Sequence, residues 1–402
     1  MYSGRYVFSQ IMDHLPIKAF TRIVNKYSGN YKVKRFKCRS QFYCMAFGQL
    51  THRNGLRDIV ACLRANSNKL YHMGIRGGVS LNNLSNANMQ RDWRIYAEFT
   101  HVLIDIARKL CSDEEFSEEI GEPVYALDST TITLALSLFP WADFRETRGG
   151  IKLHTQMELP SSIPTFIDIT AARPNDVNFL DRLTLEPGSF YVMDRAYMDF
   201  ERLYRITTNG AFFVTRLKRN IKIKRRYSHP KDSSKGIISD QTVVADEPNS
   251  FELYPAPLRR VRFRDPENGD VFSFITNNFN ISAPAVADLY KARWQIELFF
   301  KWIKQNLQIK RLFGQTMNAV KTQIWIAAAV YVLVAIIRKR LDLTEYSLYN
   351  ILQVLSVSQF CYDELSQLFM NSELQLEDNK FLTNCHSSTY NGTLVFILDY
   401  YP

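Results

Sequence analysis

From Pro123 onward the hydrophobic residues form short runs, and this change of pattern constrains the fold more than any other feature of the sequence. Two of the runs, at 124–127 and 190–193, each end in an aspartate. Short apolar runs bounded by turn residues are typical of buried strands, and helical spacing lies between them at 176–183 and 200–209. The pattern predicts an α/β fold with a mixed sheet.

Residues 1–112 differ from this strand-rich region in both periodicity and charge. Their apolar residues recur at helical spacing, and they carry 18 lysines and arginines against five acidic residues. This surplus exceeds the net charge of +10 of the whole chain. Within it, residues 31–39 interleave cations with aromatics, which suits contacts with phosphates and bases, although a solvated surface strand would explain the same composition.

The changes of pattern predict the domain organisation. Residues 113–119 are too acidic to join a core and mark a boundary. Residues 218–280 are polar and β-prone, so we interpret them as an insertion, and after Pro284 the chain is strongly helical. The predicted units are a helical domain at 1–112, a core at 123–217 that resumes at 281–345, the β-rich insertion at 218–280, and a C-terminal helical region at 346–402.

The stretch 288–310 has the periodicity of one amphipathic helix. At about 100° per residue, its apolar side chains gather on one side, which must face a core. Cations surrounding a rigidly held carboxylate would suit phosphate chemistry, but ion pairs at i, i+4 on an ordinary surface helix would explain the same spacing. The polar face beside the apolar stripe carries Tyr290, Arg293, Glu297, Lys301 and Lys304.

Three carboxylates, Asp128, Asp194 and Glu297, come from three separate predicted elements. Strand ends in α/β sheets gather ligand and catalytic groups, although a lone aspartate after a strand also serves as a helix cap or turn former. Two divalent cations about 3.5–4 Å apart can activate the attacking oxygen and stabilise the leaving oxygen of a phosphodiester. Hard cations such as Mg²⁺ require oxygen ligands, so these three residues are the candidate metal ligands and catalytic groups.

The polar helix face also resembles the signature of a known enzyme family. It is similar to the YREK signature of bacterial DDE transposases of insertion-sequence family four, which includes the transposases of transposons five and ten. The two aspartates that end the strand runs stand where that family has the first two members of its triad. The resemblance covers residues 123–340, with further similarity at 150–154 and 210–216. The signature residues here are Tyr290, Arg293, Glu297 and Lys304.

This resemblance implies an RNase H-like fold, interrupted before Glu297 by the β-rich insertion. It implies that Asp128 bridges two Mg²⁺ ions, for which Mn²⁺ can substitute, while Asp194 and Glu297 each complete one site. The signature arginine and lysine would contact phosphates near the cut, and the tyrosine would lie near the terminal nucleotide. The implied reaction is cut-and-paste transposition, with hydrolysis at the 3′ end, hairpin formation and opening, and strand transfer.

The resemblance also implies partners. These are double-stranded DNA, as terminal inverted repeats and as target, and a second copy of the chain, so that a homodimer acts on two ends. The basic N-terminal region resembles a DNA-binding domain found ahead of the core in some relatives. Further candidate DNA contacts are Lys152, Lys301 and the basic run 218–226, whereas His154 is expected to be buried.

One departure from the family concerns the aromatic residue on which relatives stack a flipped base. In at least one relative it is a tryptophan of the insertion, but this chain has no tryptophan between Trp141 and Trp294. Any aromatic face can stack a base. The candidates for a substitute are Phe272, Phe274 and Tyr254.

Other classes of protein fit less well. Six scattered cysteines without a CxxC pair indicate a reduced, cytoplasmic protein, and no His and Cys cluster has zinc-ligand spacing. The resemblance further implies a bacterial, nucleoid-associated protein. The apolar stretch 324–337 is too short for a membrane span and is interpreted as a core helix. Two alternatives stay open: an RNase H-like nuclease or resolvase that cuts without joining, and a decayed transposase that only binds DNA.

Overall fold

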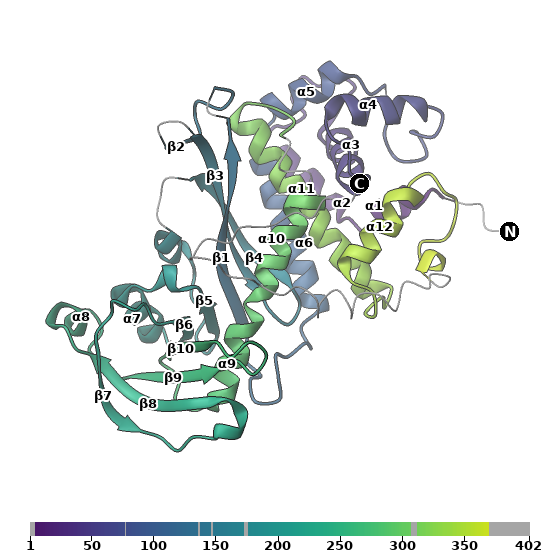
Figure 1. Cartoon of the computed structure of the whole chain (residues 1–402). Coiled ribbons are helices and arrows are strands. Elements are labelled where there is room, and N and C mark those ends of the chain that lie inside the picture. Colours follow the sequence, from purple (N-terminus) through teal and green to yellow (C-terminus); the bar gives the residue numbers. More distant parts are fainter. Residues whose placement is uncertain are drawn as a thin grey trace.

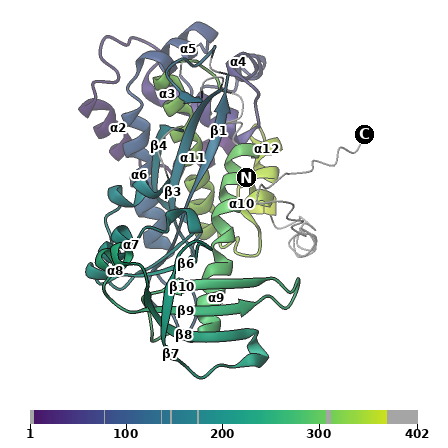
Figure 2. The ribbon, with the colours of Figure 1, turned by 60° about the vertical axis from the view of Figure 1, so that its left-hand side comes forward.

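The computed structural model describes residues 5–76, 78–135, 137–145, 148–172, 176–306 and 312–369. A long mixed sheet runs through the molecule, and helices from both halves of the chain pack beside it (Figure 1). Figure 2 shows strands β7–β10 at one end of the molecule and helices α3–α5 at the other. Of the predicted C-terminal region, residues 370–402 lie outside the described residues.

The centre of the sheet is built from strands that alternate in direction and then run parallel. β3 pairs antiparallel with both β1 and β4, whereas β5 pairs parallel with β1 and β6 pairs parallel with β5. The prediction of a mixed α/β sheet is therefore confirmed. The strands are β1 (Val124–Leu134), β2 (Asp143–Arg145), β3 (Arg148–Glu158), β4 (Ile163–Ala171), β5 (Phe190–Met193) and β6 (Phe212–Arg216).

The predicted β-rich insertion extends this same sheet. β10 pairs with β6, and the order continues outward through β9 and β8 to β7, so the described strands form one ten-stranded sheet. The short helix α8 (Pro248–Leu253) connects two of these strands. The added strands are β7 (Ile223–Ser228), β8 (Ile237–Ala245), β9 (Leu258–Arg264) and β10 (Val271–Thr276).

Helices before and after the sheet share one hydrophobic core on one of its faces. α11 packs lengthwise on α6 and also touches α3 and α5, and α3 is buried along nearly its whole length. Ser80 caps α5 as its sequence predicts, since its Oγ accepts a hydrogen bond from the Asn83 N–H at 3.2 Å. The helices are α1 (Val7–Asp13), α2 (Ile17–Lys26), α3 (Cys38–Leu50), α4 (Leu56–Ala65), α5 (Leu81–Gln90), α6 (Arg94–Leu110), α11 (Met317–Arg340) and α12 (Leu348–Ser358).

α11 contains the apolar stretch 324–337. By length and composition this helix could cross a membrane, but 89% of its apolar window is buried inside the protein. Ile326, Ala328 and Val332 have no exposed surface. The helix therefore forms the centre of the core shared by the N-terminal and C-terminal helices, as a core helix should.

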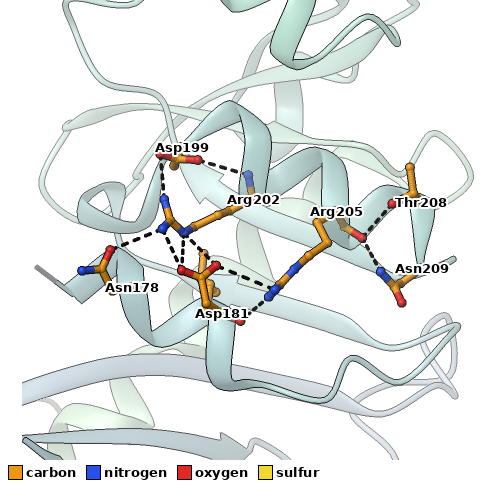
Figure 3. Close-up of polar contacts among 8 residues, drawn as sticks. Asn178, Asp181, Asp199, Arg202, Arg205, Thr208 and Asn209 are labelled. Atoms are coloured by element: carbon orange, nitrogen blue, oxygen red, sulfur yellow. Dashed lines mark hydrogen bonds and ion pairs between the residues drawn. The ribbon is translucent and has the colours of Figure 1, made fainter.

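The opposite face of the sheet is covered by α7 (Phe200–Thr208) and the 3₁₀ turn Asp176–Arg182. Figure 3 shows how Arg202 joins the two: its guanidinium binds both carboxylate oxygens of Asp181, at 3.0 and 2.7 Å, and also Asp199 at 3.2 Å. Asp199 caps α7 by accepting from the Arg202 N–H at 3.1 Å. This network braces the chain that follows the end of β5.

Candidate active site

Asp128 lies within β1, on the face of the sheet that α10 (Trp294–Asn306) covers. Ala126, two residues earlier, belongs to the core on that face, and side chains two apart along a strand point the same way. The Asp128 side chain is 20% exposed, and its Oδ1 accepts a hydrogen bond from the Ser129 N–H at 2.8 Å. β1 thus presents a half-buried carboxylate toward α10.

The polar helix face predicted over 288–310 is divided between two helices. α9 (Ala283–Ala292) ends at Arg293, and α10 begins at the next residue, so the prediction of a single helix is wrong. The Arg293 N–H bonds to the Tyr290 carbonyl three residues earlier, and this tighter 3₁₀ spacing interrupts the α-helical ladder. Residues 307–310 of the predicted helix lie outside the described residues.

Arg293 joins two of the predicted catalytic carboxylates. One end of its guanidinium lies 3.1 Å from Asp128 Oδ2, and the other lies 2.7 Å from Glu297 Oε1. The Arg293 side chain is only 13% exposed, so both ion pairs are shielded from water. The structure therefore brings a carboxylate of β1 and a carboxylate of α10 to the two sides of one cation.

Asp194 lies beside this pair because of strand register. In the parallel pairing of β1 and β5, Leu127 is opposite Met193. The next residues, Asp128 inside β1 and Asp194 just after β5, therefore lie next to each other on the same face of the sheet. Asp194 Oδ1 also caps the following 3₁₀ turn by accepting from the Ala196 N–H at 3.0 Å. The turn-forming role and the place beside Asp128 are thus combined in one residue.

The pKa of Asp128 is raised mainly because its carboxyl group is buried. Burial raises the pKa of Asp128 from 3.8 to about 6; Arg293 and the Ser129 N–H oppose the shift, and Glu297 and Asp194 add to it. Oxygen donors held close together in a partly dry site suit a hard divalent cation. Among the described residues no three Asp, Glu, His or Cys side chains are yet close enough together to surround one ion.

The raised pKa gives a prediction for the metal-free protein. Because the folded state holds the Asp128 proton more tightly than the unfolded chain does, stability should fall as pH rises from about 4 to about 6, by at most about 3 kcal/mol. Urea unfolding in EDTA across this range would measure it. The unfolding free energy of Asp128→Asn should depend less on pH in this range than that of the wild type. Parallel curves of unfolding free energy against pH for the two proteins would show that the pKa of Asp128 is not raised.

Tyr290 connects the carboxylates to a row of aromatic rings. Its ring lies 5.5 Å from the Arg293 guanidinium and 4.8 Å from the ring of Phe274, which stacks on Phe272 with ring centroids 6.1 Å apart. Phe274 is buried, whereas Phe272 is partly exposed, and the Arg216 guanidinium lies 4.8 Å over its ring. The sequence analysis did not identify Arg216 as a candidate site residue. Its position at the end of a predicted strand was the feature that could have pointed to it.

Tyr254 is placed elsewhere. It is fully buried in the core on the other face of the sheet, where its hydroxyl pairs with that of Thr207 at 2.8 Å. A base could not stack on it without opening that core, because both of its faces are already covered. The suggestion that Tyr254 stacks a base is therefore wrong.

The three lysines predicted to bind DNA lie in different surroundings. On α10, Lys301 is exposed and Lys304 is half-buried, and their spacing from Glu297 keeps them on its side of the helix. Lys152 on β3 is opposite Thr131 in the register, so its side chain lies on the other sheet face from Asp128. There it pairs with Asp176 at 2.9 Å, and its side chain is 13% exposed.

His154 and Asp176 complete the polar group on that other face. His154 is buried, as expected, and its Nε2 lies 3.1 Å from the Thr170 hydroxyl. Asp176 accepts a hydrogen bond at 2.5 Å from the hydroxyl of Ser129, the residue that follows Asp128 in the sequence. Sequence reasoning did not identify Asp176, which is isolated in sequence from every residue it contacts.

The chain matches two known families. The family described as Transposase DDE domain matches residues 119–333, more than half of the chain. The chain belongs to the DDE transposase family. Its fold is the RNase H-like mixed sheet of that family, and DDE transposases are enzymes that cleave DNA and transfer strands with divalent metal ions. Residues 3–76 match a second family, described as a domain of unknown function (DUF4372).

Individual relatives are named as transposases, two of them for insertion-sequence elements. The chain is 35% identical to y4zB of Sinorhizobium fredii over 63% of its own length and 70% of that protein, and y4zB is named as a transposase. It is 35% identical to the IS5377 transposase of Geobacillus stearothermophilus, over 53% of its own length and 56% of that protein. The IS4SA transposase of Synechocystis is 25% identical over 66% of this chain and 74% of that one. These relatives support membership of insertion-sequence family four.

A solved structure is also similar at low identity. The piggyBac transposase, in a synaptic complex with hairpin DNA, aligns with a TM-score of 0.45 and 10% identity, covering 96% of this chain and 84% of that one.

Proposed function

We propose that this transposase binds the terminal inverted repeats of its own element, cleaves the DNA there with two Mg²⁺ ions, and joins the freed 3′ ends to target DNA. Mn²⁺ would substitute for Mg²⁺. The observation that carries the proposal is the position of Arg293 between Asp128 and Glu297, with Asp194 in the register position next to Asp128. Two carboxylates from separate elements thereby meet at one cation in a half-buried site, and the third follows the neighbouring strand.

The chain's own residues have distinct roles in this proposal. Asp128, Asp194 and Glu297 would hold the ions, which supply polarisation of the attacking oxygen and stabilisation of the leaving oxygen. Arg293 offers a rigid fork that suits a phosphate, and Lys304 and Lys301 extend positive charge along α10. Lys152, which pairs with Asp176, would reach DNA only by leaving that carboxylate.

We further propose that Phe272 stacks the base that flips during hairpin formation. Of the three aromatic candidates, Phe274 is covered by its neighbours and Tyr254 is buried in the other core, so Phe272 alone is partly exposed. A base would share the Phe272 ring with Arg216 or displace the guanidinium that lies over it. Tyr290 and Arg293 connect Phe272 to the carboxylates through a series of ring contacts. A base stacked there would lie beside the cleavage site.

Phe272→Ala should reduce the hairpin product while first-strand nicking continues. Base stacking on an aromatic side chain contributes about 1–3 kcal/mol, so we expect a loss of roughly tenfold to a hundredfold. Phe272→Trp should retain hairpin formation, and Phe251→Ala, at an exposed aromatic of α8, serves as the matched control. Wild-type hairpin yield from Phe272→Ala would assign the stacking to another residue.

The protein is proposed to act as a dimer that pairs two DNA ends, in the nucleoid of a bacterial cell. The domain divisions predicted from the sequence belong to this proposal as well. They would give the N-terminal helices the recognition of DNA ends and the sheet with α10 the chemistry. Sedimentation of the protein with and without end DNA would measure the dimer, and full-rate cleavage by a monomer would contradict it.

The test of the whole proposal is incubation of the full chain with Mg²⁺ and a labelled fragment carrying the element's end, resolved on a denaturing gel. Nicks, then hairpins, then joined target products would establish the proposed reaction. Nicks without joining would indicate the nuclease alternative, and binding without any cut would indicate a transposase that has lost its activity.

A further inference from the structure

α5 has an exposed face made almost only of side-chain amides. Its sequence, LNNLSNANMQ, contains no charged residue. At about 100° per residue the exposed side chains fall within roughly 120° around the helix axis, while Leu84, Ala87 and Asn88 are buried. Asparagine is a weaker helix former than alanine by up to about 0.7 kcal/mol per residue, so helix stability does not explain this composition. The exposed residues are Asn82, Asn83, Asn86, Met89 and Gln90.

The inner side of α5 is fixed rigidly to two core helices. The Gln41 amide of α3 donates to Asn88 Oδ1 at 2.7 Å. From α11, the Asn318 amide donates to the carbonyls of Asn88 at 2.9 Å and Arg91 at 2.6 Å. These bonds hold the last turn of the helix, so the exposed amides are presented in one orientation.

Positive charge flanks both ends of this neutral face. At the N-terminal end, Arg57 of α4 lines a surface hollow together with Asn82 and Ser85. At the C-terminal end, Arg91 donates to the Phe36 carbonyl and lies 5.6 Å over the Phe36 ring, which places the basic segment 31–37 beside the helix.

The basic segment is available for a partner. Lys32, Lys34, Arg35 and Lys37 are exposed, and within the described part of the chain none of them forms an ion pair. Tyr31 is 72% exposed in the same segment. A row of unpaired cations next to a neutral amide surface is complementary to the phosphates and base edges of a duplex.

We propose that α5 lies in the major groove of the terminal inverted repeat and reads base edges through Asn82, Asn86 and Gln90, while Arg57 and the segment 31–37 bind the phosphates on either side. This rests on the proposed function, because it assumes that the protein binds its element's ends. The major groove admits an α-helix, and Asn and Gln amides pair with the N6 and N7 of adenine. An uncharged helix face attracts phosphates only weakly, so the contribution of α5 to binding affinity depends on the base sequence of the DNA.

The inference is tested by titrating labelled DNA of the element's end, and a scrambled duplex of equal length and composition, with the full chain at several salt concentrations. Asn and Gln amides discriminate between bases, so the triple variant Asn82→Ala, Asn86→Ala and Gln90→Ala should lose at least roughly tenfold affinity for the end. Its affinity for scrambled DNA and its salt dependence should stay as in the wild type.

The paired variant Lys34→Gln and Arg35→Gln should instead weaken binding to both duplexes and lower the salt slope by about 1.8. Asn249→Ala, at an exposed asparagine of α8, is the matched control and should change neither duplex's affinity. Alanine favours the helix, so the thermal midpoint of the triple variant should not fall.

The two failures can be told apart. A wild type that binds end and scrambled DNA equally would remove the proposed end recognition and this inference with it. A wild type that prefers the end, with the triple variant keeping that preference, would overturn only the role of α5.

Discussion

Glu297→Gln should abolish cleavage of element-end DNA while binding of that DNA stays near the wild-type level. Glutamine keeps the shape of the side chain but removes the charge that a divalent cation requires, and it also loses the ion pair to Arg293 at 2.7 Å. A metal ion stabilises the transition state of such a reaction by several kcal/mol, and each 1.36 kcal/mol changes the rate tenfold. The cleavage rate should therefore fall about 1,000-fold. Asp128→Asn and Asp194→Asn should behave alike.

The measurement is the rate of the first nick under single-turnover conditions, together with the dissociation constant for the same DNA in EDTA. Glu252→Gln, at an exposed glutamate of α8, is the matched control and should cut normally. If Glu297→Gln kept more than about a tenth of the wild-type rate, a difference of under 1.4 kcal/mol, Glu297 would not be a metal ligand. A loss of binding equal to the loss of cleavage would place it in DNA binding instead.

Asp240→Ala should unfold the protein more readily by about 3–5 kcal/mol, the usual effect of removing one partner of a buried ion pair. Asp240 on β8 and Arg259 on β9 are 5% and 7% exposed, and they form two parallel bonds of 2.9 and 2.7 Å. Arg259 also donates to the Ile281 carbonyl at 2.6 Å, just before α9. In Asp240→Ala the positive charge of Arg259 would stay buried without an acidic partner.

Thermal and urea unfolding would measure this effect. The double variant Asp240→Ala and Arg259→Met should recover most of the loss, because the buried charge is then removed as well. Glu247→Ala is the contrasting control: its pair with Lys222 is 48% and 73% exposed and should contribute less than about 1 kcal/mol. If Asp240→Ala changed stability no more than this exposed control does, the buried pair of Asp240 and Arg259 would not stabilise the junction between the added strands and α9.

The candidate site residues could be predicted from the sequence because they belong to patterns of residues that lie close together in the chain. The strand runs before Asp128 and Asp194 are local patterns, and Asp194 does follow the end of its strand, β5. The expectation that Asp128 also ends a strand is wrong, because β1 continues past it to Leu134. The signature residues were expected on one helix face, and Arg293 does bind Glu297 across one turn. The ion pair from Arg293 to Asp128 joins residues 165 positions apart, and no local pattern contains it.

Several features could be decided only by packing. The insertion is a continuation of the main sheet because β10 pairs with β6, and strand periodicity says nothing about which strand a run will pair with. Tyr254 and Phe272 look equivalent in the sequence, yet Tyr254 is fully buried in a core and Phe272 is partly exposed. The break at Arg293 interrupts a sequence whose helical period continues through it.

The sequence by itself therefore determined the order of helices and strands, the three carboxylates and the basic character of the N-terminal region, because each depends on residues close together in the chain. Tertiary structure alone decided which of these meet: the cation between Asp128 and Glu297, the core shared by α6 and α11, and the neutral face of α5 between two basic flanks. The physical reason is that burial and ion pairing depend on distance in space, which the spacing of residues along a chain does not specify.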